Sequence, residues 1–165
     1  MANITMNGET VSTRAELPPV GVPAPDFTVV NTDLEEISLS DFEGPVVLNI
    51  FPSLDTGICA NSVRTFNEKA ASLEGVTVLN ISRDLPFAQG RFCGAEGIED
   101  AIVASDFRTT FGETYGVTMI DGPLQGLLSR AVVVLDAKHD IVYTEQVPEI
   151  KQEPDYEAAL AALQK

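Results

Sequence analysis

The sequence predicts an α/β fold with a central mixed sheet flanked by helices, and two patterns support that prediction. Val46–Phe51 is apolar at nearly every position, as expected for a strand buried on both faces of a parallel or mixed sheet. From residue 60 to 73, apolar residues recur at spacings of three and four, which indicates an amphipathic helix. A second strand is expected at Val76–Ile81. Strand, helix and strand in this order fit a right-handed βαβ crossover.

The chain begins with a predicted β-hairpin. Asn7-Gly8 separates two short segments, Ile4–Met6 and Glu9–Val11. Asn-Gly supplies the positive φ that a type I′ turn needs, so the two segments are expected to pair. We expect this hairpin to be a small ornament in an N-terminal extension over residues 1–16.

The remaining elements follow from shorter signals. Four prolines between residues 17 and 25 exclude regular structure there. A turn from Asp136 to Asp140 joins two predicted antiparallel strands, and an Ala- and Leu-rich segment after Pro154 predicts a closing helix. The expected elements are strands at 27–30, 37–39, 101–104, 131–135 and 141–144, and helical segments at 87–93, 111–115 and 155–165.

Composition limits the size and the partners of the protein. With 165 residues, 44% of them hydrophobic, the chain is long enough for one domain and too short for two ordinary ones, so residues 1–165 are expected to form a single domain. The net charge of -15 argues against nucleic acid or anionic membranes as partners. No apolar run approaches the ~18 residues of a membrane helix, and the first residues do not resemble a secretion signal. A cytoplasmic location is therefore expected.

Cys59 is the residue with the clearest chemical signal. It lies where the loop after the central strand meets the predicted helix. The unsatisfied N–H groups and partial positive charge at a helix N-terminus favour a thiolate over a thiol. Two cysteines are too few for a disulfide scaffold, which leaves redox chemistry or packing. A metal site is not expected, because only His139 is available as a further soft ligand.

The loop before Cys59 resembles the peroxiredoxin signature Pro-x-x-x-Thr-x-x-Cys, which Pro52, Thr56 and Cys59 match residue by residue. Longer stretches resemble the bacterial thiol peroxidases, which are atypical 2-Cys peroxiredoxins of the thioredoxin-like superfamily. These stretches are Phe51–Cys59, Asp84–Gly97, Arg130–Val134 and Glu153–Glu157. The resemblance covers nearly the whole chain, including the hairpin, and implies a thioredoxin-like fold.

The resemblance also implies a role for five residues. Cys59 would be the peroxidatic cysteine, whose thiolate attacks a peroxide oxygen and becomes a sulfenic acid. Thr56 would place its hydroxyl beside the sulfur, and Pro52 would limit water around it. Arg130 would hold thiolate and peroxide with fixed N–H donors. Cys93 would be the resolving cysteine, forming an intramolecular disulfide with Cys59. Because a disulfide needs Cα atoms within ~7 Å, we expect local unwinding near one or both cysteines on oxidation.

By the same resemblance, the protein is expected to be a thioredoxin-dependent peroxidase that acts in antioxidant defence. Its substrates would be hydrogen peroxide and organic hydroperoxides, and thioredoxin would reduce the disulfide. A homodimer is implied, and no cofactor is expected.

Other interpretations remain open from the residues alone. Without the resemblance, the sequence favours Cys59 and Cys93 as buried residues that only pack in the core. It also favours Arg130 as the partner of a carboxylate in a salt bridge at the end of a strand. A Cys-His hydrolase or acyltransferase would need His139 beside the thiol, yet His139 falls in the turn 136–140, where we expect it to be exposed. A redox sensor or a disulfide-stapled binding domain would use both cysteines without turnover.

Overall fold

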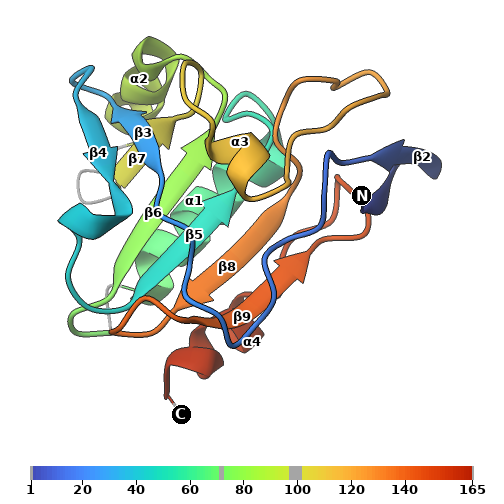
Figure 1. The fold of residues 1–165 in the computed structure, drawn as a ribbon. Helices are drawn as coiled ribbons and strands as arrows, with labels where there is room; N and C mark the ends of the chain where they lie inside the picture. The colour runs from blue at the N-terminus through green and yellow to red at the C-terminus, as the bar shows by residue number, and fades with distance from the viewer. Residues whose placement is uncertain (1, 71–72, 97–101, 165) are drawn as a thin grey trace.

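A computed structural model of the chain, which describes residues 2–70, 73–96 and 102–164, contains a seven-stranded mixed sheet (Figure 1). The strand order is β4-β3-β7-β6-β5-β8-β9. The predicted central strand is β5 (Val46–Ile50), which pairs in parallel with β6 (Thr77–Ser82) and antiparallel with β8 (Ala131–Leu135). All five residues of β5 are buried, as the continuous apolar run predicted. The helix α1 (Gly57–Ala70) connects β5 to β6, which confirms the βαβ unit.

The other elements lie close to their expected positions. The β8–β9 hairpin is confirmed, with β9 spanning Ile141–Gln146. Parts of three predicted elements lie outside the described residues: residues 71–72 of the helix at 60–73, residue 101 of the strand at 101–104, and residue 165 of the closing helix. The remaining bounds are β1 (Asn3–Met6), β2 (Glu9–Ser12), β3 (Thr28–Asn31), β4 (Glu36–Ser38), α2 (Pro86–Glu96), β7 (Ile102–Ser105), α3 (Phe111–Thr114), α4 (Tyr156–Ala161), and the 3₁₀ turns η1 (Leu39–Asp41) and η2 (Ala162–Gln164).

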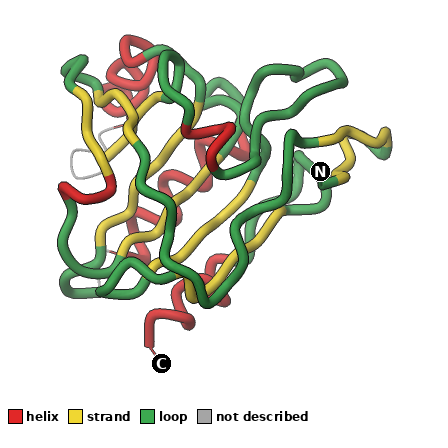
Figure 2. Tube along the Cα trace, viewed as in Figure 1, coloured by secondary structure: helices red, strands yellow, loops and turns green. Residues whose placement is uncertain are grey.

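Successive side chains of β5 point to opposite faces of the sheet, so the core is divided between these two faces. Val47 packs with Phe66 of α1 and Leu160 of α4 on one face. Leu48 belongs to the cluster on the opposite face, which includes Phe111 of α3. In Figure 1, α1 accordingly lies behind the sheet and α3 in front of it. The proline-rich segment 17–25 has no helix or strand and crosses the front of the sheet as a long loop (Figure 2).

Two helix boundaries differ from the sequence prediction, and the first of them affects the site. The helix α1 begins at Gly57 rather than at residue 60, so its first turn includes Cys59. The closing helix is capped by the side chain of Asp155, which accepts a hydrogen bond from the Ala158 N–H, and it continues into η2 after Ala161. In the described residues, none of the helices is both long and apolar enough to cross a bilayer.

The N-terminal hairpin is confirmed, but its description as an ornament is wrong. Asn7 and Gly8 have φ values of 53° and 85°, as a type I′ turn requires. The hairpin is fixed to the body of the protein by two backbone hydrogen bonds. The Thr5 N–H donates to the Pro148 carbonyl oxygen at 2.8 Å, and the Ile150 N–H donates to the Thr5 carbonyl oxygen at 2.8 Å. Ile4 is buried in a cluster with Ile150. The hairpin therefore helps to position the loop that follows β9.

Candidate active site

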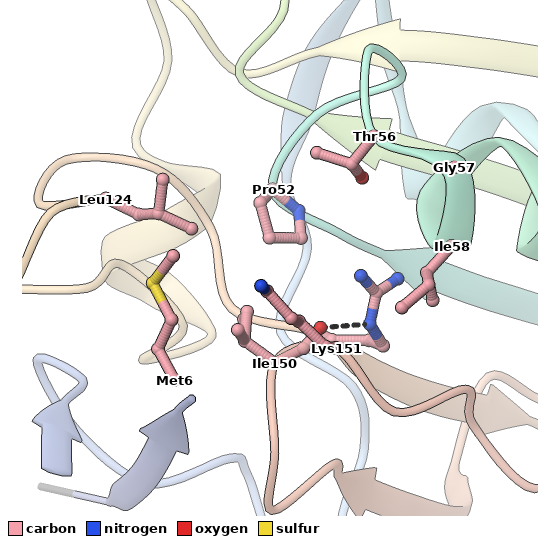
Figure 3. A pocket seen from close by; sticks show the side chains of 9 residues that line it. Met6, Pro52, Thr56, Gly57, Ile58, Leu124, Ile150 and Lys151 are labelled. Carbon is pink, nitrogen blue, oxygen red and sulfur yellow. Dashed lines mark hydrogen bonds between the residues drawn. The ribbon is translucent and has the colours of Figure 1, made fainter. Parts of the chain in front are cut away.

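Cys59 and Arg130 meet in the interior of the protein, although 71 positions separate them in the sequence. Cys59 lies in the first turn of α1 and is fully buried, while Arg130 directly precedes β8 and is 2% exposed. Arg130 Nη2 donates a hydrogen bond to Cys59 Sγ at 3.2 Å. Arg130 Nε donates to the Ile150 carbonyl oxygen at 2.9 Å, the dashed line in Figure 3. The guanidinium is thus held in one orientation against the sulfur.

The charged guanidinium of Arg130 is hydrogen-bonded to the sulfur of Cys59. Among the described residues, no carboxylate forms a salt bridge with Arg130, so the sequence-level alternative of a strand-end ion pair is not what the geometry shows. A buried cation is costly without a compensating group, and in the described residues the Cys59 sulfur is the side-chain atom that accepts a hydrogen bond from the guanidinium. Arg130 Nη1 is also buried and has no hydrogen-bond partner in this part of the chain. One N–H donor group therefore contacts the sulfur, and another is free for a bound molecule.

The loop between β5 and α1 is held by Asp84, which follows β6. The Asp84 carboxylate accepts hydrogen bonds from Ser53 Oγ at 2.7 Å and from the Leu54 N–H at 2.8 Å. Thr56 Oγ1 donates to the Ser53 carbonyl at 3.0 Å. This hydrogen bond closes the loop, and the placement of the hydroxyl beside the sulfur stays a prediction. Its lone pairs remain available to accept a hydrogen bond.

A pocket of about 260 Å³ opens beside Arg130. Pro52 is buried and forms part of its wall, and its shielding role stays a prediction. Figure 3 shows Met6 and Leu124 on one side of the pocket and Thr56, Gly57 and Ile58 on the other. The full lining consists of Met6, Pro52, Thr56, Gly57, Ile58, Leu124, Arg130, Ile150 and Lys151.

Most of the apolar lining was not identified from the sequence. Met6 comes from the hairpin that had been taken as an ornament, and Leu124 and Ile150 come from loops far along the chain. The buried cluster of Ile4, Met119 and Ile150, against which Met6 and Leu124 pack, brings these segments together. No local periodicity marks such residues, because each contributes a single side chain from a different element.

Cys93 lies on α2, as predicted, and its thiol is free, as is that of Cys59. Cys93 is half-buried and packs against the cluster that includes Cys59 and Val103. Burial raises the pKa of the Cys93 thiol. Cys59 thus belongs to a buried cluster that Cys93 contacts, and the two cysteines are not linked by a disulfide.

His139 lies at the other end of the sheet from Cys59. It occupies the β8–β9 turn with a φ of 64°, and its Nε2 is 3.1 Å from the carbonyl oxygen of Gly44, which precedes β5. It is half-buried, not exposed as expected. Cys59 follows the opposite end of β5, so this imidazole cannot act on the thiol, and a Cys-His hydrolase is excluded.

Comparison with known proteins agrees with this geometry. Residues 19–160 match the Redoxin family. A thiol peroxidase of Mycobacterium tuberculosis is 61% identical over 164 residues, which cover 99% of each chain. The chain belongs to the bacterial thiol peroxidases of the Redoxin family. It is accordingly an enzyme, a thiol-dependent peroxidase of the peroxiredoxin type.

Solved structures support the same assignment. A peroxiredoxin-like protein from Aquifex aeolicus is 39% identical, with a TM-score of 0.90 over 98% of this chain and 96% of that chain. A thiol peroxidase from Chromobacterium violaceum is 22% identical and has a TM-score of 0.91 over 99% of this chain and 96% of that chain. The latter shows the fold alone, and it confirms the thioredoxin-like architecture with its N-terminal hairpin.

Proposed function

We propose that this thiol peroxidase reduces hydrogen peroxide and organic hydroperoxides through a Cys59 sulfenic acid, which Cys93 resolves as an intramolecular disulfide. Thioredoxin reduces that disulfide. The enzyme acts as a single domain of residues 1–165, with residues 1–16 as its hairpin extension. It works as a homodimer in the cytoplasm, in antioxidant defence.

The hydrogen bond from Arg130 Nη2 to Cys59 Sγ is the observation that carries the proposal. It stabilises the thiolate, which is the nucleophile. When the thiolate attacks the terminal peroxide oxygen, the O–O bond breaks and negative charge moves to the departing oxygen. Arg130 Nη1 is buried and has no hydrogen-bond partner among the described residues, so it is the donor available for that oxygen. The oxygen leaves as an alcohol or water after it takes up a proton, and Cys59 becomes a sulfenic acid.

The pocket beside Arg130 supports organic hydroperoxides as substrates. Met6, Leu124 and Ile150 offer an apolar surface next to the guanidinium. An alkyl or aryl group gains binding energy by leaving water for such a surface, at about 25 cal/mol per Å² of buried apolar area. Hydrogen peroxide has no such group, so it gains only the polar contacts. We expect a lower KM for cumene hydroperoxide than for hydrogen peroxide.

Sustained turnover tests this proposal. The purified protein is mixed with excess cumene hydroperoxide, thioredoxin, thioredoxin reductase and NADPH, and NADPH oxidation is followed. We expect continuous oxidation in the wild type and none above background in Cys59→Ser. A wild type that stops after one equivalent of peroxide would instead match a redox sensor or a disulfide-stapled domain. A second assay, in which a glutaredoxin system replaces thioredoxin, tests the choice of reductant.

A further inference from the structure

The pocket beside Arg130 is positively charged, although the protein as a whole is strongly acidic. The chain carries 25 acidic and 10 basic residues. Among the described residues that line the pocket, two are basic, Arg130 and Lys151, and none is acidic. A cleft with apolar walls and charges of one sign concentrates the electric field inside it. The pocket therefore attracts an anionic group that the rest of the surface repels.

The two cations differ in their depth in the pocket. Arg130 is 2% exposed and lies against the sulfur of Cys59, whereas Lys151 is exposed to solvent. In Figure 3 the Lys151 side chain extends across the pocket, toward the side that Met6 and Leu124 form. The guanidinium thus occupies the inner end of the pocket, and the ammonium group of Lys151 occupies its outer end.

Carboxylates close to Lys151 in the sequence are held by other donors. Glu149 Oε1 accepts a hydrogen bond from the Gly8 N–H at 3.2 Å, and its Oε2 accepts one from the backbone N–H of Lys151 at 2.9 Å. Glu153 accepts a hydrogen bond from the Tyr156 hydroxyl at 3.0 Å. In the described part of the chain, no carboxylate forms a salt bridge with the Lys151 ammonium group. This ammonium group is therefore available to a bound anion.

The volume of the pocket fits one small organic hydroperoxide. It is about 260 Å³, close to the lower end of the range of about 300–1,000 Å³ for ligand pockets. When the peroxide group lies at Arg130, the rest of the molecule occupies the apolar part of the pocket. Met6, Leu124 and Ile150 form that part. The end of the molecule that is remote from the peroxide group then lies near Lys151. Cumene hydroperoxide has no charged group at that end, so it leaves the ammonium group unused.

We propose that Lys151 is a specificity-determining residue that selects organic hydroperoxides carrying a carboxylate. This inference rests on the proposed function. The peroxide group binds at Arg130, the apolar body of the substrate packs along the wall, and the carboxylate accepts a charge-assisted hydrogen bond from the Lys151 ammonium group. Because Lys151 is exposed, water and salt weaken this contact. The preference for the carboxylate is therefore several-fold, and it decreases as the salt concentration rises.

A matched pair of substrates tests the proposal: cumene hydroperoxide with a carboxylate in the para position, and the methyl ester of the same compound. The kcat/KM for each is measured with the thioredoxin system, and the ratio of acid to ester is compared between variants, which cancels their intrinsic difference in reactivity. We expect Lys151→Gln to lower this ratio by about three- to fivefold, and Lys151→Glu to lower it by about tenfold, because repulsion replaces attraction. Lys151→Arg should retain the ratio. In the wild type the ratio should fall as salt is raised to about 0.5 M, and in Lys151→Gln it should change little.

Lys138→Gln is the matched control for the loss of one positive charge. Lys138 is exposed in the β8–β9 turn, at the other end of the sheet from Cys59, so this variant should keep the wild-type ratio. An unchanged ratio in a folded Lys151→Gln protein, or an equal fall in both variants, would overturn the role of Lys151 and leave the proposed function intact. A wild type that does not turn over cumene hydroperoxide would overturn the proposed function, and this inference with it.

Discussion

Replacing Arg130 by Gln should slow the reaction of Cys59 with peroxide by about 10²–10³-fold. Arg130 Nη2 donates to the sulfur, and the buried Nη1, which has no hydrogen-bond partner in residues 2–70, 73–96 and 102–164, is available to the departing oxygen. Hydrogen bonds to charged groups contribute about 1.5–3 kcal/mol each, and loss of one preorganised donor to a developing oxyanion costs about 10²–10³ in rate. Glutamine is neutral and shorter, so it supplies neither charge nor the two-pronged geometry.

The assay is a single turnover in the Cys93→Ser background, quenched at increasing times and read by mass spectrometry as Cys59 sulfenic acid. Arg130→Lys is the matched control: it keeps the charge but loses the fixed fork, so we expect an intermediate rate. Because Arg130 Nε also holds the Ile150 carbonyl, thermal unfolding of each variant verifies that the fold is retained. A folded Arg130→Gln protein that reacts within threefold of the wild-type rate would refute the role given to Arg130.

Three further predictions concern the loop, the pocket and a buried carboxyl group. Thr56→Val should slow sulfenic acid formation by about fivefold, because it removes the hydroxyl that donates to the Ser53 carbonyl, a bond of about 1 kcal/mol; Thr56→Ser should retain the rate. Met6→Ala should raise the KM for cumene hydroperoxide several-fold and leave kcat/KM for hydrogen peroxide unchanged, since it removes only apolar lining; equal effects on both substrates would count against the pocket assignment. Burial raises the pKa of the Asp106 carboxyl from its ordinary value of 3.8 to about 6, although the positive charge of Arg83 acts to lower it. The folded state thus binds this proton more tightly than the unfolded state, so the stabilisation is complete below about pH 4 and is lost as the pH rises through 6. Asp106→Asn should therefore raise the free energy of unfolding at pH 7.5 by up to about 3 kcal/mol and much less at pH 4, as measured by urea unfolding; a gain independent of pH would contradict this account.

The fold could be predicted from the sequence where local pattern and burial coincide. Val46–Phe51 has the continuous apolar run of a central strand, and β5 occupies that place. Asn7-Gly8 specified its own turn through positive φ values. Helix ends were less predictable. The start of α1 at Gly57 lies in a segment with no apolar periodicity, and tertiary contacts of the loop with Asp84 fix it there.

The candidate site could be predicted only in part, because a short motif identifies residues of one loop but not residues that the fold brings in from distant segments. Cys59, Thr56 and Pro52 lie within one loop, so a short motif identifies them together. Arg130 was identified through the resemblance alone, because the acidic composition by itself favoured a salt bridge at the end of a strand. Met6 carries no signal of its own, since its role depends on a hairpin that packs against the loop after β9.

Chemical trapping of the sulfenic acid shows whether Cys59 is the peroxidatic cysteine. Cys93→Ser protein receives one equivalent of cumene hydroperoxide and then dimedone, which traps sulfenic acids, and peptide mass spectrometry locates the adduct. We expect one adduct per chain, on Cys59, with one equivalent of cumyl alcohol released. Peroxide consumption without an adduct on Cys59, or undiminished consumption by a Cys59→Ser variant, would contradict it.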